Sequence, residues 1–135
     1  MVRARRKGAL EPWIGTKISR TIVEFGQPLI EQLPPAPSRA LCEQTFEWII
    51  TIWNAHAMSR FWGQPQHLTA VQDTIRNAIA EGVLPIDALE AFEALNARRQ
   101  QPQFVDDPRA VGHWELRETS AGEWNLRCDA RLPPS

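Results

Sequence analysis

Apolar residues recur at helical spacing near the start of the chain. The steps between them are four, three, four and four residues, which places one stripe along a helix: Ile18, Ile22, Phe25, Leu29 and Leu33. The spacing predicts a helix over about residues 16–33. The stripe runs through Gly26 and Pro28, which either kink a helix or separate two short ones, and its continuity favours a kink. A proline-rich segment from Pro34 ends the helix.

The next apolar segment predicts a central helix over about residues 38–61. Ser38 is a good N-cap residue. Apolar side chains then surround almost the whole segment, as in a helix that neighbours cover on several sides. The β-branched run at residues 49–52 would suit a strand, but the length of the segment and its cap favour a helix.

Two amphipathic segments predict two further helices, over about residues 65–81 and 85–100. Gly82 is placed to end the first of them, and Pro85 suits the first turn of the second. A tetrad of an aromatic residue, Gly, Gln and Pro occurs at residues 25–28 and again at 62–65. At the second copy polar residues interrupt the apolar stripe, so we predict a kink at the first copy and a turn between helices at the second.

The pattern changes to strict alternation after residue 111. Five apolar residues at every second position form the clearest strand pattern in the chain: Trp124, Leu126, Cys128, Ala130 and Leu132. A loop at residues 120–122, with Gly122 in the left-handed conformation, would join this strand to an earlier one. That register sets Leu116 opposite Leu126, Trp114 opposite Cys128, Glu115 opposite Arg127 and His113 opposite Asp129. The sequence therefore predicts an antiparallel hairpin over about residues 111–132.

Together these elements predict an α+β protein that is mostly α. We expect a compact bundle of about four helices with the C-terminal hairpin packed on it, because a lone hairpin is barely stable in water. Residues 13–135 would form a single globular domain, and residues 1–12 a disordered basic arm.

Composition narrows the class of protein. No segment approaches the length of a membrane span, and the basic N-terminus lacks the apolar stretch of a signal peptide, so we expect a cytoplasmic protein with no membrane partner. Cys42 and Cys128 fit no disulfide framework and are expected to be buried. Six tryptophans offer large apolar faces, and three of them are candidates for binding a partner: Trp62, Trp114 and Trp124.

The spacing of glycines and histidines excludes several kinds of site. No two of the seven glycines lie closer than seven residues apart, so neither a P-loop nor a dinucleotide-binding motif is present. The sequence also lacks GxSxG, HExxH and EF-hand spacings. No pair of histidine or cysteine residues has the spacing of zinc ligands. We therefore expect no metal site and no cofactor.

A possible catalytic group consists of His56, Arg60 and His67. Arg60 follows His56 by four residues, so both would project from the same side of the central helix. His56 could act as a general base in a cleft lined by tryptophans, with Arg60 stabilising an anion. A histidine in an apolar helix is more often a core residue with a hydrogen-bonded partner, so no catalytic residue is assigned.

Basic residues gather in two places. Four of them lie within the first seven residues of the chain: Arg3, Arg5, Arg6 and Lys7. Arg98 and Arg99 lie at the end of the last predicted helix, where the helix dipole favours cations. Both groups are either solvated or able to contact nucleic acid.

Three functions follow as hypotheses. The first is a non-enzymatic protein–protein interaction or regulatory module, of the antitoxin or immunity-protein kind or a small subunit of a larger complex, which associates with another protein or with itself. The second is a small metal-independent hydrolase or nuclease that uses His56, Arg60 and His67. The third is an accessory protein that binds nucleic acid through its basic arm.

Overall fold

The computed structural model describes residues 18–119 and 123–134. Its fold is α+β and mostly α, with five helices and a two-stranded antiparallel sheet in the described residues. This confirms the predicted class. The expected basic arm at residues 1–12 lies outside the described residues, as does the loop at residues 120–122.

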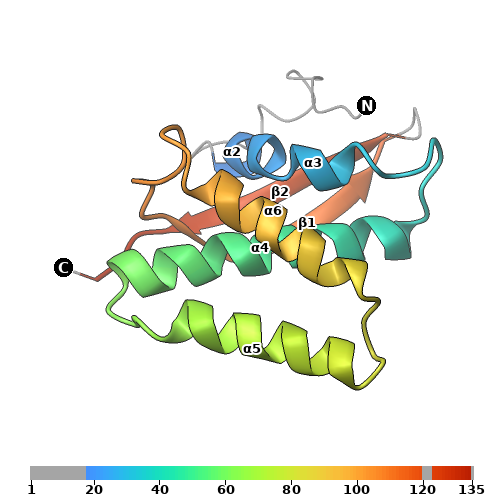
Figure 1. Cartoon of the computed structure of the whole chain (residues 1–135). Coiled ribbons are helices and arrows are strands. Elements are labelled where there is room, and N and C mark those ends of the chain that lie inside the picture. The colour runs from blue at the N-terminus through green and yellow to red at the C-terminus, as the bar shows by residue number, and fades with distance from the viewer. Residues whose placement is uncertain (1–17, 120–122, 135) are drawn as a thin grey trace.

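The long helix α4 (Arg39–Phe61) is the centre of the molecule (Figure 1). The hydroxyl oxygen of Ser38 accepts a hydrogen bond from the Leu41 N–H at 3.1 Å and caps the helix. The β-branched run at residues 49–52 is helical. Helix α4 contacts the hairpin on one side and the last two helices on another, which explains why so much of its circumference is apolar.

The helix expected over residues 16–33 is divided at Gly26 into α2 (Ile18–Phe25) and α3 (Gln27–Ile30). The path remains hydrogen-bonded across the bend, because the Gly26 N–H donates to Ile22 and the Ile30 N–H donates to Gly26, at 2.9 and 3.0 Å. A Cβ atom on Gly26 would lie 2.5 Å from Cδ1 of Ile49. Glycine is therefore needed here because the bend lies directly against α4.

Helices α5 (His67–Ala80) and α6 (Asp87–Arg99) both pack against α4, and α6 runs back obliquely across the molecule after α5 (Figure 1). Gly63 and Gly82 have φ angles of 73° and 78° and stop α4 and α5 in the left-handed conformation. The predicted helix starts at Pro65 and Pro85 are each two residues early. Both prolines lie in the turn before the helix.

The hairpin consists of β1 (Ala110–Glu118) and β2 (Trp124–Arg131). All four predicted cross-strand pairs are present, and a bulge lies between Val111 and His113. The inner face buries Leu116, Leu126 and Cys128 against α2 and α4. The outer face is polar and mostly exposed, so among the described residues the helices cover only the inner face of the sheet.

The layers meet around an aromatic cluster that belongs to three separate segments. Phe25 of α2, Trp53 of α4 and Phe104 of the loop after α6 contact one another edge to face, with ring centroids 5.2–6.0 Å apart. This cluster fixes the loop over residues 100–109 against the core. No helix in the described ranges has the length and apolar character needed to cross a membrane.

Candidate functional site

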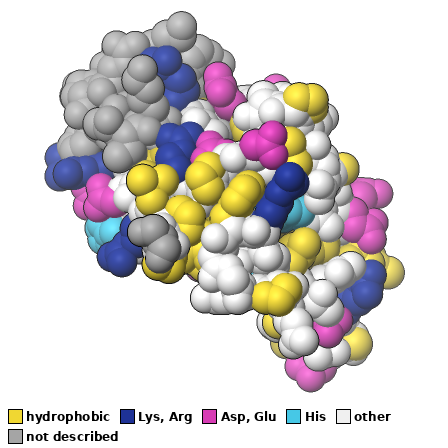
Figure 2. All heavy atoms as spheres, turned by 90° about the vertical axis from the view of Figure 1, so that its left-hand side faces the viewer, with side chains coloured by type: hydrophobic (Ala, Val, Ile, Leu, Met, Phe, Trp, Pro, Cys, Tyr) yellow, Lys and Arg dark blue, Asp and Glu magenta, His cyan; other side chains and the backbone are white. Residues whose placement is uncertain are grey.

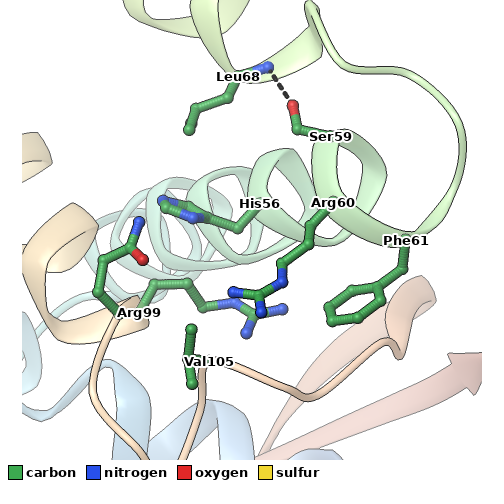
Figure 3. Close-up of a pocket in the computed structure, with 8 residues that line it drawn as sticks. His56, Ser59, Arg60, Phe61, Leu68, Arg99 and Val105 are labelled. Atoms are coloured by element: carbon green, nitrogen blue, oxygen red, sulfur yellow. Dashed lines mark hydrogen bonds between the residues drawn. The ribbon is translucent and has the colours of Figure 1, made fainter.

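A pocket of about 210 Å³ lies at the C-terminal end of α4 (Figure 3). It is lined by residues of α4, the start of α5, the end of α6 and the following loop: His56, Ser59, Arg60, Phe61, Leu68, Arg99, Gln100 and Val105. The helical spacing correctly brings His56 and Arg60 together. Trp62 and His67 are not among the lining residues, so the expected three-residue group of His56, Arg60 and His67 does not share this pocket.

His56 is held in a fixed orientation inside the pocket wall. Its side chain is 9% exposed, and its Nε2 atom is hydrogen-bonded to Oδ1 of Asn96 on α6. Because an amide oxygen can only accept, Nε2 carries the proton and donates. Burial lowers the pKa of His56, the charge of Arg99 lowers it further, and the bond to Asn96 opposes both. The imidazole is therefore neutral at neutral pH.

This lowered pKa makes the stability of the fold depend on pH. In the unfolded chain the His56 imidazole binds a proton near its ordinary pKa of 6.5. In the folded protein it binds that proton only at a lower pH. Its contribution to stability is therefore complete above pH 6.5 and is lost as the pH falls towards the folded pKa. We expect the free energy of unfolding to decrease as the pH falls from about 7 to below the ordinary pKa of 6.5, with a slope of at most about 1.4 kcal/mol per pH unit from this group.

Urea unfolding of the native chain and of His56→Gln across that range measures the effect. The variant should have a flatter dependence on pH. Equal slopes in both proteins would show that another group is responsible.

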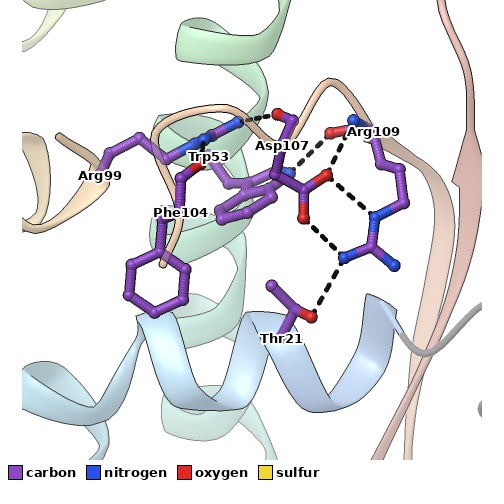
Figure 4. Close-up of polar contacts among 6 residues, drawn as sticks. All are labelled: Thr21, Trp53, Arg99, Phe104, Asp107 and Arg109. Carbon is purple, nitrogen blue, oxygen red and sulfur yellow. Dashed lines mark hydrogen bonds and ion pairs between the residues drawn. The ribbon is translucent and has the colours of Figure 1, made fainter. Parts of the chain in front are cut away.

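Arg99 lies in the interior and supports the loop after α6 (Figure 4). Its side chain is 2% exposed. The guanidinium stacks 3.6 Å from the centroid of the Trp53 ring, and it donates to the carbonyl oxygens of Phe104 and, at 2.9 Å, of Asp107. This burial corrects the expectation of a solvated helix end. The charge of Arg99 instead becomes part of the pocket wall.

Burial also lowers the pKa of Arg99, to about 10. Asp107 opposes this change, and the positive charges of Arg60 and Arg109 add to it. The Nε atom of Arg99 is buried and has no hydrogen-bond partner among the described residues. Arg99 is thus charged at neutral pH, and one of its donors makes no hydrogen bond within the described part of the chain.

Arg98 has a different role from its neighbour. Its guanidinium donates to the carbonyl oxygens of Glu24 and Phe25, at 2.7 and 2.9 Å. These are carbonyls of the last turn of α2, where a cation is favourable. Arg98 therefore joins α6 to the bend at Gly26, and a contact with nucleic acid would compete with this bond.

An ion pair that the sequence did not reveal fixes the end of the same loop. Asp107 accepts from Arg109 at 2.6 and 2.9 Å, and Arg109 also donates to Thr21 (Figure 4). Burial acts to raise the pKa of Asp107, but the hydrogen bonds and charge of Arg109 outweigh it and hold the pKa below its usual range. The sequence indicated a turn near Asp107 and no more than that.

The three tryptophans proposed for binding are all half-buried. Trp62 donates from its indole nitrogen to the Pro108 carbonyl at 3.0 Å. Trp114 and Trp124 pack against the core from the inner face of the hairpin, and Arg39 lies 5.1 Å from the Trp124 ring centroid. Of the three, only Trp62 lies next to a residue that lines the pocket.

Neither cysteine has the properties of a reactive thiol. Cys42 and Cys128 are 1% and 2% exposed, and both are free. Burial raises the pKa of both thiols, in Cys128 to about 12. In the ranges 18–119 and 123–134, no group of three or more histidine, cysteine or acidic side chains is placed to hold a metal ion.

The fold and the pocket define a small α+β protein with two arginines and a neutral histidine at the end of its central helix. No known family model matches the sequence. No curated protein and no solved structure shows significant similarity to it either. Its function therefore has to be argued from the site itself.

Proposed function

We propose that this protein is a non-enzymatic interaction module that docks on another protein with the surface at the C-terminal end of α4. The observation that carries this proposal is the character of the pocket, which offers charges for binding and no second group for proton transfer. No carboxylate of residues 18–119 or 123–134 lines it. His56 is neutral, and its Nε2 proton is used by Asn96.

Ser59 is also unsuited to nucleophilic chemistry. Its hydroxyl oxygen accepts a hydrogen bond from the Leu68 N–H at 2.8 Å, and in Figure 3 it is directed towards α5 rather than towards His56. A nucleophile needs a base within hydrogen-bond reach. Ser59 instead joins the end of α4 to the start of α5.

The size of the pocket also supports binding of a side chain. At about 210 Å³ it is smaller than the roughly 300–1,000 Å³ of typical cofactor and small-molecule sites. A single side chain of a partner would fill much of it. Interfaces often rely on such anchors placed in a pocket.

We propose that apolar side chains at the same end of the molecule provide the remaining contact area. We define the docking face as the pocket together with Phe61, Trp62 and Leu132. Leu132, which directly follows β2, is 69% exposed, and β2 ends near the C-terminal end of α4 (Figure 1). Figure 2 faces this end of the molecule and shows hydrophobic side chains beside a basic side chain and a histidine. Mixed surfaces with arginine and aromatic residues are typical of interface centres.

The proposal is tested with a tagged chain expressed in its own host. A partner that copurifies with the native chain should be lost from Leu132→Glu, which adds a charge to the docking face. It should be retained by Asn77→Glu, an exposed position of α5 that serves as the matched control. A partner that binds both variants equally, or a chain that stays monomeric and alone, would contradict the proposal.

A second candidate is the metal-independent hydrolase, which is favoured by the position of His56 and Arg60 in one open pocket. It requires the neutral imidazole to act as a base. Under this hypothesis His56→Gln would abolish cleavage of RNA and of other phosphodiesters while the chain stays folded. Cleavage that survives in this variant would exclude it.

Binding of nucleic acid through the basic arm remains a separate hypothesis, since residues 1–12 lie outside the described residues. It predicts an affinity that falls steeply with salt and is lost when residues 1–7 are deleted. We also propose a cytoplasmic location, in keeping with two buried, unpaired cysteines.

A further inference from the structure

We infer that the pocket receives a carboxylate of the partner protein, an Asp or Glu side chain or a C-terminus, between the guanidinium groups of Arg60 and Arg99. This inference rests on the proposed docking function and specifies what enters the docking face. The two arginines come from different helices, α4 and α6, and both line the pocket. Figure 3 shows their guanidinium groups next to each other.

Arg60 is available to a partner. Its side chain is 52% exposed, and its Nη2 lies 3.2 Å from Oδ1 of Asp106, which is itself 82% exposed. Ion pairs between such exposed groups contribute little, about 0–1 kcal/mol. The guanidinium also lies over the Phe61 ring, 5.4 Å from its centroid. A carboxylate arriving from a partner can therefore replace or share this contact at small cost.

Arg99 supplies the second, independent observation. It is 2% exposed, and its Nε donor is unpaired among the described residues. A buried polar group without a partner costs about 1–3 kcal/mol, and more when it is charged. The Nη1 and Nη2 atoms of the same group already donate to the loop. The remaining donor lies in a residue that forms the pocket wall.

None of the described residues that line the pocket is acidic. Two carboxylates outside the lining balance the pair only in part: Asp106 makes an exposed ion pair with Arg60, and Asp107, which is bonded to Arg109, offsets some of the effect of burial on Arg99. The pKa of Arg99 is lowered chiefly by burial but also by the charge of Arg60, which shows that the two guanidinium groups repel each other. An anion between them would attract both groups and offset this repulsion. A desolvated arginine–carboxylate contact is also among the strong hydrogen bonds of proteins.

Two features favour a carboxylate over a phosphate. Arg60 and Arg99 lie in the last turns of α4 and α6, and the C-terminal end of a helix carries a partial negative charge. This disfavours a dianion more than a monoanion. The apolar side chains of Phe61, Leu68 and Val105 also suit the methylene groups of an acidic side chain.

The experiment follows the arginine Nε–H signals in ¹⁵N NMR spectra while acetate or inorganic phosphate is added to the full chain. Acetate should shift the Arg60 and Arg99 signals in a saturable way. Arg60→Gln, an exposed change that leaves the core intact, should weaken acetate binding by about tenfold or more, as expected for loss of one charged hydrogen bond. Arg76→Gln, at an exposed position of α5, should leave it unchanged.

Each outcome decides the inference. Equal acetate affinity in the native chain and in Arg60→Gln would overturn it, as would acetate shifts confined to other arginines. Phosphate binding more tightly than acetate at the same two residues would assign the site to a phosphorylated ligand and also overturn it. If acetate fails to bind while Leu132→Glu still loses the partner, the carboxylate is excluded and the docking function stands. If acetate binds but both Leu132→Glu and Asn77→Glu keep the partner, the docking function fails instead.

Discussion

Replacement of Trp53 by alanine is expected to lower the free energy of unfolding by about 3–5 kcal/mol. The side chain is fully buried and contacts Phe25 and Phe104 edge to face. Its indole nitrogen donates to the Arg109 carbonyl at 2.8 Å, and its ring carries the Arg99 guanidinium. The variant loses packing, a hydrogen bond and the support of Arg99 together. Urea unfolding followed by circular dichroism measures the loss.

Trp62→Ala is the matched control for this prediction. Trp62 also donates to a loop carbonyl, that of Pro108 at 3.0 Å, but its ring is only half-buried. We expect a smaller loss, about 1–2 kcal/mol. Equal losses in the two variants would show that the loop over residues 100–109 is not organised around Trp53.

Replacement of Asn54 by alanine is expected to cost about 2–3 kcal/mol. The Asn54 side chain donates to the Val111 carbonyl at 3.0 Å and accepts from the Val111 N–H at 2.8 Å. This reciprocal pair joins α4 to the start of β1, next to the bulge in the hairpin. Without this pair, the N–H and C=O groups of the buried residue Val111 lose their hydrogen-bond partner. Urea unfolding measures the cost, and hydrogen exchange at the Val111 amide locates it.

Asn77→Ala provides the comparison, because Asn77 is exposed on α5. Its effect should stay within about 0.5 kcal/mol. A Val111 amide that remains equally protected in Asn54→Ala would contradict the role assigned to Asn54.

The parts of the fold that could be predicted from the sequence depend on local patterns. The hairpin register follows from alternation within a few residues of the turn, and all four pairs are present. Ser38 caps α4 because N-cap bonds reach only to the next turn. His56 and Arg60 meet because they lie one helical turn apart.

The rest depends on contacts between distant segments, for which a single sequence carries no local pattern. Asn96 fixes His56 across 40 residues, and Trp53 supports Arg99 from another helix. The position of Arg99 at the end of a predicted helix suggested an exposed side chain. The loop over residues 100–109 instead folds back and covers it. His67 was expected beside His56 because it follows closely along the chain. It begins α5, within the predicted helix, and it does not line the pocket.

Arg99 connects the stability of the fold with the proposed site. It holds the loop after α6 through two carbonyl oxygens and lines the pocket. Because its charge is buried and one donor is unpaired, a bound anion would stabilise the loop and the folded state together. Ligand binding is therefore expected to raise the free energy of unfolding.

The most direct test is the structure of the protein in complex with the partner that copurifies with it. We predict that the docking face is buried, with a partner carboxylate oxygen at hydrogen-bond distance, about 3 Å, from Arg60, Arg99 or both. A partner bound to the polar outer face of the hairpin or to the exposed side of α5, with the pocket still open to solvent, would contradict it.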